Sequence, residues 1–280
     1  MGLATWREFG ALSGILIACI LPFLLGGNGY SWFALIFAAS LFIAFVLMRG
    51  RWMNVNLAFP SLSDLWSNTI LRRFLVFAFF NALPVSVTST LFVFFVEYRL
   101  NLPDLTGVFL LLFFLSAATS TILWRKAALR IGAAESLTIG MILAILTFFW
   151  AFTLPQGASA LFAVICVTSG AALGADMILP LALFAGYQEK QGNSPTLAFG
   201  MWSFAQKASL AVAAGVVLPL LAMSDFAPNG QNTQGAVFAL GLFYALVPAT
   251  LKMFAILWLW FVLRPTGAFA QLSDRSNPLI

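Results

Sequence analysis

The sequence predicts an all-α, polytopic membrane protein with eight transmembrane helices. The first reason is composition: 62% of the residues are hydrophobic and only 8% are charged, whereas a soluble domain carries about 25% charged residues. The second is pattern, because the apolar residues form eight long blocks bounded by charged residues, Gly, Pro or Asn. A hydrocarbon core of about 30 Å is crossed by about 20 apolar residues in a helix, so each block is long enough to span a membrane.

The blocks follow one another with short connections, except for one polar interval between the second and the third. We place them approximately at 9–25, 31–48, 74–96, 105–124, 136–153, 159–186, 197–222 and 235–263. The first block could also be a signal peptide. It lacks a small-residue cleavage site and is joined to the next block by the short link GGNGY, and both features favour a retained span.

The polar interval divides the chain into parts. We predict two transmembrane helices over 1–50, a cytoplasmic linker over 51–73, a six-helix bundle over 74–264 and a cytoplasmic tail over 265–280. In the bundle, the third, fourth, sixth and seventh blocks should line a polar face, whereas the fifth and eighth should be peripheral. The polar residues that support this assignment are Asn81, Ser116, Thr119, Asp176, Ser203 and Lys207.

Orientation follows from the basic residues between the blocks, which gather on the cytoplasmic side of a membrane. On one side lie Arg7, Arg49, Arg51, Arg72, Arg73, Arg125, Lys126, Arg130, Lys190, Arg264 and Arg275. The opposite side carries only Arg99. We therefore expect a multi-pass protein of the cell inner (cytoplasmic) membrane with both termini in the cytoplasm.

Composition also excludes several functions. The net charge of +5 comes from scattered basic residues without interleaved aromatics, so no nucleic-acid partner is expected. Cys19 and Cys166 lie in apolar blocks and are interpreted as small membrane-helix residues, not as a disulfide. With no histidine and with dispersed acidic residues, no common zinc site or nucleophile–base pair can form. We expect neither an enzyme nor a bound cofactor.

Three formally charged residues fall inside the blocks: Asp176, Lys207 and Lys252. Asp176 and Lys207 each lie about ten residues, or about 15 Å, from the cytoplasmic end of consecutive antiparallel helices. We predict that they face each other, either as part of a solute or ion path or as a structural ion pair. Lys252 is interpreted as snorkelling or packing, because its block has no other polar group at that level.

The stretch around Lys207 offers groups that bind polar solutes. Ser203 lies four residues earlier, hence on the same helix face, and Gln206 is adjacent. A hydroxyl, an amide and an ammonium group together suit a sugar or a carboxylate. Trp202 could stack on such a solute, or face lipid or a neighbouring helix.

Two other positions are candidates. Pro180 lacks an N–H, so the carbonyl of Asp176 loses its helical donor and could bind a coupling cation; the alternative is an ordinary proline kink. Asn81 needs a partner on another helix or in a water-filled cavity. Gly170 and Gly174 have the spacing that permits close helix approach.

Several long segments resemble the glycoside–pentoside–hexuronide:cation symporters, the melibiose-permease branch of the major facilitator superfamily. They are NTILRRFLVFAFFNALPVSVTSTLFVFFVE, GADMILPLALFAGYQEK, FGMWSFAQKASLAVAAG and PNGQNTQGAVFALGLFYALVPATLKM. The resemblance implies a fold of two six-helix halves with the sugar bound between them. It places Lys207 on a cavity lysine of the eleventh helix, Ser203 on a hydroxyl residue one turn earlier, and Asn81 on an asparagine of the seventh.

The sequence departs from that family in two respects. Tyr187 is present, but the acidic residues of the family's Ala-Asp-x-x-Asp-Tyr run are not. The resemblance matches the eight blocks to the last eight of twelve helices, with a complete C-terminal six-helix bundle. It therefore implies that the first four helices and their cation-binding acids are missing.

The resemblance implies symport of a sugar or sugar-like solute with Na⁺ or H⁺. We expect the solute at Lys207, Ser203, Gln206, Asn81 and Trp202, and ion coupling at Asp176 and Lys207. The expected partners are the solute, the coupling cation and the lipid bilayer, with the protein as a monomer. The alternatives are a lysophospholipid or other amphiphile carrier of the same fold, and a non-transporting membrane fragment.

Overall fold

The computed structural model describes residues 10, 14, 17, 29–49, 67–191, 195–228 and 230–266. Most of the predicted first span, most of the linker and nearly all of the predicted tail therefore lie outside the described residues. The regular elements within the described ranges are all helical. The chain divides into two compact units, Gly2–Pro60 and Ser61–Ile280, and each is considered by itself.

The first unit contains α2, Gly29–Met48, which corresponds to the predicted second span. Its sequence is apolar around the whole circumference, and its large side chains are exposed, among them Leu35, Phe42 and Leu47. A helix with no polar face suits a hydrocarbon environment.

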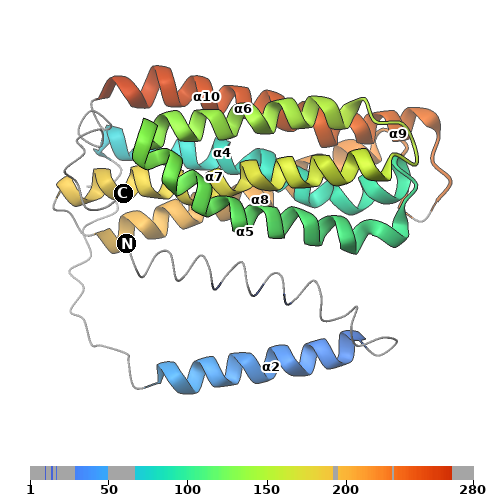
Figure 1. The fold of residues 1–280 in the computed structure, drawn as a ribbon, viewed down its shortest axis with the longest axis horizontal. Helices are drawn as coiled ribbons and strands as arrows, with labels where there is room; N and C mark the ends of the chain where they lie inside the picture. Colours follow the sequence, from blue (N-terminus) through green and yellow to red (C-terminus); the bar gives the residue numbers. More distant parts are fainter. Residues whose placement is uncertain are drawn as a thin grey trace. The chain divides into compact units, whose positions relative to one another are not determined.

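The second unit contains six long helical spans (Figure 1). In chain order its elements are α4 Thr69–Phe94, the π-helical η2 Phe95–Arg99, the 3₁₀-helical η3 Pro103–Leu105, α5 Thr106–Ile131, α6 Ala133–Phe152, α7 Ser159–Gln191, α8 Pro195–Ala222, α9 Gln234–Gly241, the π-helical η4 Leu242–Leu246, α10 Val247–Trp258, the π-helical η5 Leu259–Leu263 and the 3₁₀-helical η6 Arg264–Thr266.

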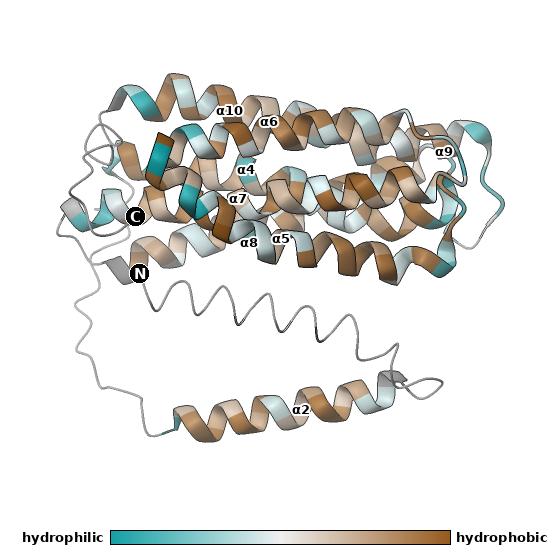
Figure 2. Ribbon diagram, in the orientation of Figure 1, coloured by the Kyte–Doolittle hydropathy of each residue, from teal (hydrophilic) through white to brown (hydrophobic). Residues whose placement is uncertain are grey.

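Seven described helices are long and apolar enough to cross a membrane, and they confirm the second to eighth predicted blocks. Some helices extend further than the apolar blocks. α4 begins five residues before the predicted start at 74, because the Asn68 side chain caps it by accepting hydrogen bonds from the N–H groups of Ile70 and Leu71 at 3.1 Å. Hydropathy identifies the apolar middle of a helix but not its polar ends. Figure 2 shows these hydrophilic ends in teal, next to the connecting loops.

α4 is the central helix of the second unit. It packs mainly against α8 and α10 and also contacts α7, which in turn packs against α5 and α6. α6 also contacts α10, whereas α8 meets α7 at few points. As a result α4 is buried along most of its length, and α8 is covered mainly on the side that faces α4.

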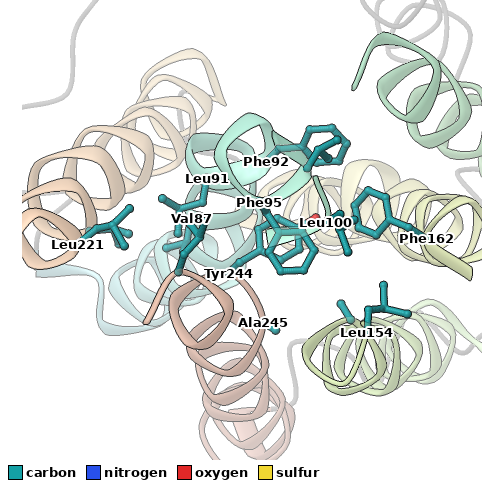
Figure 3. Packing of buried hydrophobic residues seen from close by; sticks show 14 of the residues in the cluster. Val87, Leu91, Phe92, Phe95, Leu100, Leu154, Phe162, Leu221, Tyr244 and Ala245 are labelled. Carbon is teal, nitrogen blue, oxygen red and sulfur yellow. The ribbon is translucent and has the colours of Figure 1, made fainter. Parts of the chain in front are cut away.

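Aromatic side chains fill one of the two main hydrophobic clusters. Phe95 and Tyr244 stack with ring centroids 4.0 Å apart, and Phe162 of α7 packs against both Phe92 and Phe95 (Figure 3). Phe95 and Tyr244 belong to π-helical turns, so the bulges of two neighbouring helices meet in this cluster.

The α5–α7 interface depends on small residues, as the Gly170 and Gly174 spacing predicts. A Cβ atom at Gly174 would overlap Ser120, and one at Gly170 would overlap the Phe113 carbonyl group. Because glycine has no side chain, the backbones of α5 and α7 can approach closely at these two positions. The predicted close helix contact is confirmed.

Candidate functional site: a buried charge network and an exposed polar face of α8

The structure pairs Asp176 with Lys252 and not with Lys207. The Nζ atom of Lys252 lies 2.5 Å from Oδ2 of Asp176, with the side chains only 1% and 7% exposed, respectively. The predicted Asp176–Lys207 pair is therefore wrong. Equal depth does not determine which helices are neighbours: α8 packs on α4 and scarcely meets α7, so Lys207 is not brought to the carboxylate.

Asn81 completes the network from the central helix α4. Lys252 Nζ donates to the Asn81 side-chain oxygen Oδ1 at 2.9 Å and to its backbone oxygen at 3.3 Å. The amide nitrogen Nδ2 of Asn81 donates to the other carboxylate oxygen of Asp176 at 3.4 Å. An ammonium group has three donors, and all three are used here. The opposite orientation of the amide would point its N–H groups at the ammonium.

Each of the three helices carries a proline within about one turn of its network residue: Pro84 in α4, Pro180 in α7 and Pro248 in α10. A proline leaves the carbonyl four residues earlier without its helical donor. In α7 that carbonyl belongs to Asp176 itself. The polar centre of the bundle thus coincides with helix irregularities, where backbone oxygens are available.

The interpretation of Lys252 as snorkelling is wrong, because its side chain is buried and paired with Asp176. The prediction that the eighth block is peripheral is also wrong, because α10 packs against α4 and α6. Lys252 lies on the buried stripe of α10 with Pro248, Ala249 and Ala255, at spacings of three and four residues. That register was visible in the sequence and could have revealed a buried lysine. Neither polar partner of Lys252 belongs to α10: Asn81 comes from α4 and Asp176 from α7.

The polar face predicted for α5 also has a different role. Ser116 donates to the Val167 carbonyl of α7 at 2.6 Å, and Trp124 donates to the Ala171 carbonyl at 2.7 Å. Thr119 bonds to carbonyls within its own helix. The side chains of Ser116 and Trp124 therefore join α5 to α7, while α6 packs between α7 and α10 and contributes nothing to the charge network.

Three of the predicted binding residues share an exposed face of α8. Ser203, Gln206 and Lys207 are all exposed, and their spacing of three and four residues places them on one side of the helix. Lys207 forms no hydrogen bond or ion pair with any other residue that the structure describes. It lies near the middle of the span Leu197–Ala222.

The other two predicted binding residues lie elsewhere. Trp202 is 2% exposed and stacks on Phe184 of α7, with ring centroids 4.7 Å apart, so it faces a neighbouring helix. Ser209 is also buried, seven residues after Trp202 on the same side of α8, and its Oγ lies 3.1 Å from Oγ of Ser86 in α4. Asn81 belongs to the buried network and not to the exposed face.

The long apolar helices and the intramembrane charges define a multi-pass helical membrane protein of the secondary-transporter class. A family model described as MFS/sugar transport protein matches residues 1–263, and the chain belongs to that family. Family membership implies a transporter and not an enzyme. A comparison with curated proteins gives no match.

Proposed function

We propose that the protein carries out symport of a sugar or sugar-like solute with Na⁺ or H⁺, in the manner of the melibiose-permease branch that its sequence resembles. The observation that carries this proposal is the face of α8 formed by Ser203, Gln206 and Lys207, which is polar and exposed at mid-span. A lysine in contact with hydrocarbon at that depth costs at least about 2.5 kcal/mol. This face therefore suits a hydrated cavity and not lipid.

The chemistry of the face fits a polyhydroxylated solute. The Lys207 ammonium donates to solute hydroxyl or carboxylate oxygens, the Gln206 amide both donates and accepts, and the Ser203 hydroxyl does the same over a shorter reach. Trp202 and Asn81 support this face indirectly: Trp202 fixes α8 against α7, and Asn81 holds α4, on which α8 packs.

Uptake into proteoliposomes containing the full chain tests the proposal. Labelled glycosides, pentosides and hexuronides are offered under an inward Na⁺ gradient or an inward proton gradient. Lys207→Ala should abolish uptake of the transported solute, and Ser203→Ala should raise its KM. The matched control is Val212→Ala, which changes a 42% exposed side chain. Val212 lies five residues after Lys207 and nine after Ser203, hence on the opposite side of α8, and this change should leave uptake unchanged. Unaltered uptake by Lys207→Ala would refute the proposed role of this face.

An amphiphile carrier is the second candidate, and one observation favours it. Leu210, one turn after Lys207 on the same side of α8, is 46% exposed, so an ammonium group adjoins an apolar surface. Such a pair suits a phosphate group attached to an acyl chain. In the same proteoliposomes, uptake of a labelled lysophospholipid with no uptake of any sugar would favour this candidate, and uptake of neither would favour a non-transporting protein.

A further inference from the structure

We propose that the oxygens of Asn81 and Asp176 form a site for a monovalent cation, and that the Lys252 ammonium is its resident occupant. This inference concerns α4, α7 and α10, not the exposed face of α8, so it does not depend on which solute is transported. It assigns a binding site to the bundle interior, with alkali-metal and ammonium ions as the class of ligand.

The donor atoms around Lys252 Nζ are of the kinds that hold a cation. Three oxygens of different kinds converge on one nitrogen: a carboxylate oxygen at 2.5 Å, a side-chain amide oxygen at 2.9 Å and a backbone carbonyl oxygen at 3.3 Å. Carbonyl and carboxylate oxygens at interrupted transmembrane helices are the donors that hold Na⁺ in transporters. Pro180 leaves one further oxygen, the Asp176 carbonyl, without its helical donor.

The orientation of the Asn81 amide also supports a cation site. A salt bridge alone requires only that Asp176 and Lys252 attract each other. Here the amide directs its oxygen at the ammonium and its N–H at the carboxylate, and the Asn81 backbone oxygen is also used. The polar atoms are therefore arranged around the position of the cation and not merely around the carboxylate.

The charge of Asp176 requires a cation at this position. Asp176 and Lys252 balance each other in a region where both side chains are more than nine-tenths buried. Without the ammonium, a carboxylate remains in a low-dielectric interior, where an unpaired charge is strongly unfavourable. The space left by a shortened side chain would then admit a small cation. In the native protein the ammonium is tethered to α10 and cannot diffuse away, so the site is closed to exchangeable ions.

The tethered ammonium limits the part that Asp176 can play in ion coupling. The sequence predicts Asp176 as a coupling residue, but a carboxylate occupied by a tethered ammonium is not free to bind Na⁺. If transport is driven by Na⁺, the ion binds at another place. Lys252 acts here as a positioning residue that fixes α10 against α4 and α7.

The test is thermal unfolding of the detergent-purified full chain at constant ionic strength in choline, sodium, lithium, potassium or ammonium chloride. We compare the native protein, Asp176→Asn, Lys252→Ala, and Lys252→Ala combined with Asp176→Asn. For Lys252→Ala we expect a saturable rise in Tm with at least one small cation relative to choline. The double variant, which lacks the carboxylate, should lose that rise. The native protein and Asp176→Asn should respond to the salts alike, because the ammonium fills the site.

For variants that fold, two results would overturn the proposal. One is a folded Lys252→Ala variant whose Tm is the same in all five salts. The other is a Na⁺ response of the native protein that Asp176→Asn abolishes, because it would show that Asp176 is open to exchangeable ions. If Lys252→Ala does not fold in choline, the same variant is extracted and purified in ammonium or sodium chloride. Recovery of a monodisperse protein in either salt supports the site, and failure in both refutes it. The unfolding assay contains no solute, so its result does not depend on whether the uptake assay succeeds.

Discussion

The Asp176–Lys252 pair predicts a strong energetic coupling between two distant positions of the chain. Lys252→Met removes the positive charge but keeps an unbranched side chain of similar length, and it leaves the Asp176 carboxylate unpaired in the bundle interior. Removal of one partner of a buried ion pair typically costs about 3–5 kcal/mol. Asp176→Asn leaves the Lys252 ammonium uncompensated and should cost a similar amount.

The double variant Asp176→Asn with Lys252→Met contains no buried charge at the site. Because replacement of a whole buried pair is often close to neutral, its stability should lie well above the sum of the two single losses. The coupling free energy from the double-mutant cycle should be at least about 2 kcal/mol, against about 0.3–0.5 kcal/mol for independent sites.

The assay is unfolding of the four proteins in detergent, in choline chloride so that no small cation replaces the ammonium. The same cycle with Lys207→Met in place of Lys252→Met is the matched control, because Lys207 lies at a comparable depth but on the exposed side of α8. That control cycle should be additive. Additive losses for Asp176 and Lys252, or strong coupling between Asp176 and Lys207, would contradict the pairing described above.

Three further predictions follow from the packing and the topology. Gly174→Ala should destabilise the bundle by about 1–3 kcal/mol, because its Cβ would overlap the facing helix. The control Gly107→Ala, whose Cβ meets open space, should not destabilise it. Thermal unfolding measures both variants, and equal effects would count against close α5–α7 packing. Trp202→Ala should cost about 3–5 kcal/mol of stability in the same assay, and a loss no greater than that of the exposed Phe204→Ala would contradict its buried position. Reporter fusions at the C-terminus and in the 226–233 loop should report opposite sides of the inner membrane, and identical sidedness would refute the predicted topology.

The spans could be predicted from the sequence because hydropathy is local. Every apolar block that falls in the described residues is a helix of membrane length, and the small-residue spacing around Gly174 correctly indicates a close helix contact. The boundaries differ where polar residues extend a helix, as at Asn68.

The partner of Asp176 could not be predicted from depth, because depth fixes the height of a residue and not the helix it faces. Consecutive helices are often neighbours, and that assumption paired α7 with α8. In the structure α4 lies at the centre and brings α10 to the polar residues of α7. The register of Lys252 with Ala249 and Ala255 marks it as buried, but only the tertiary arrangement shows that Asn81 and Asp176 surround it.

The central functional claim is that Lys207 faces a solute-filled aqueous cavity. It is tested most directly by labelling Lys207→Cys in a chain whose Cys19 and Cys166 are both replaced by alanine, with a hydrophilic maleimide as the reagent. A thiolate forms readily in water and not in hydrocarbon. We predict that Cys at this position reacts, and that a transported sugar slows the reaction while a non-transported sugar does not. A thiol that fails to react, or that reacts equally with and without the sugar, would contradict the assignment of this face of α8 to solute binding.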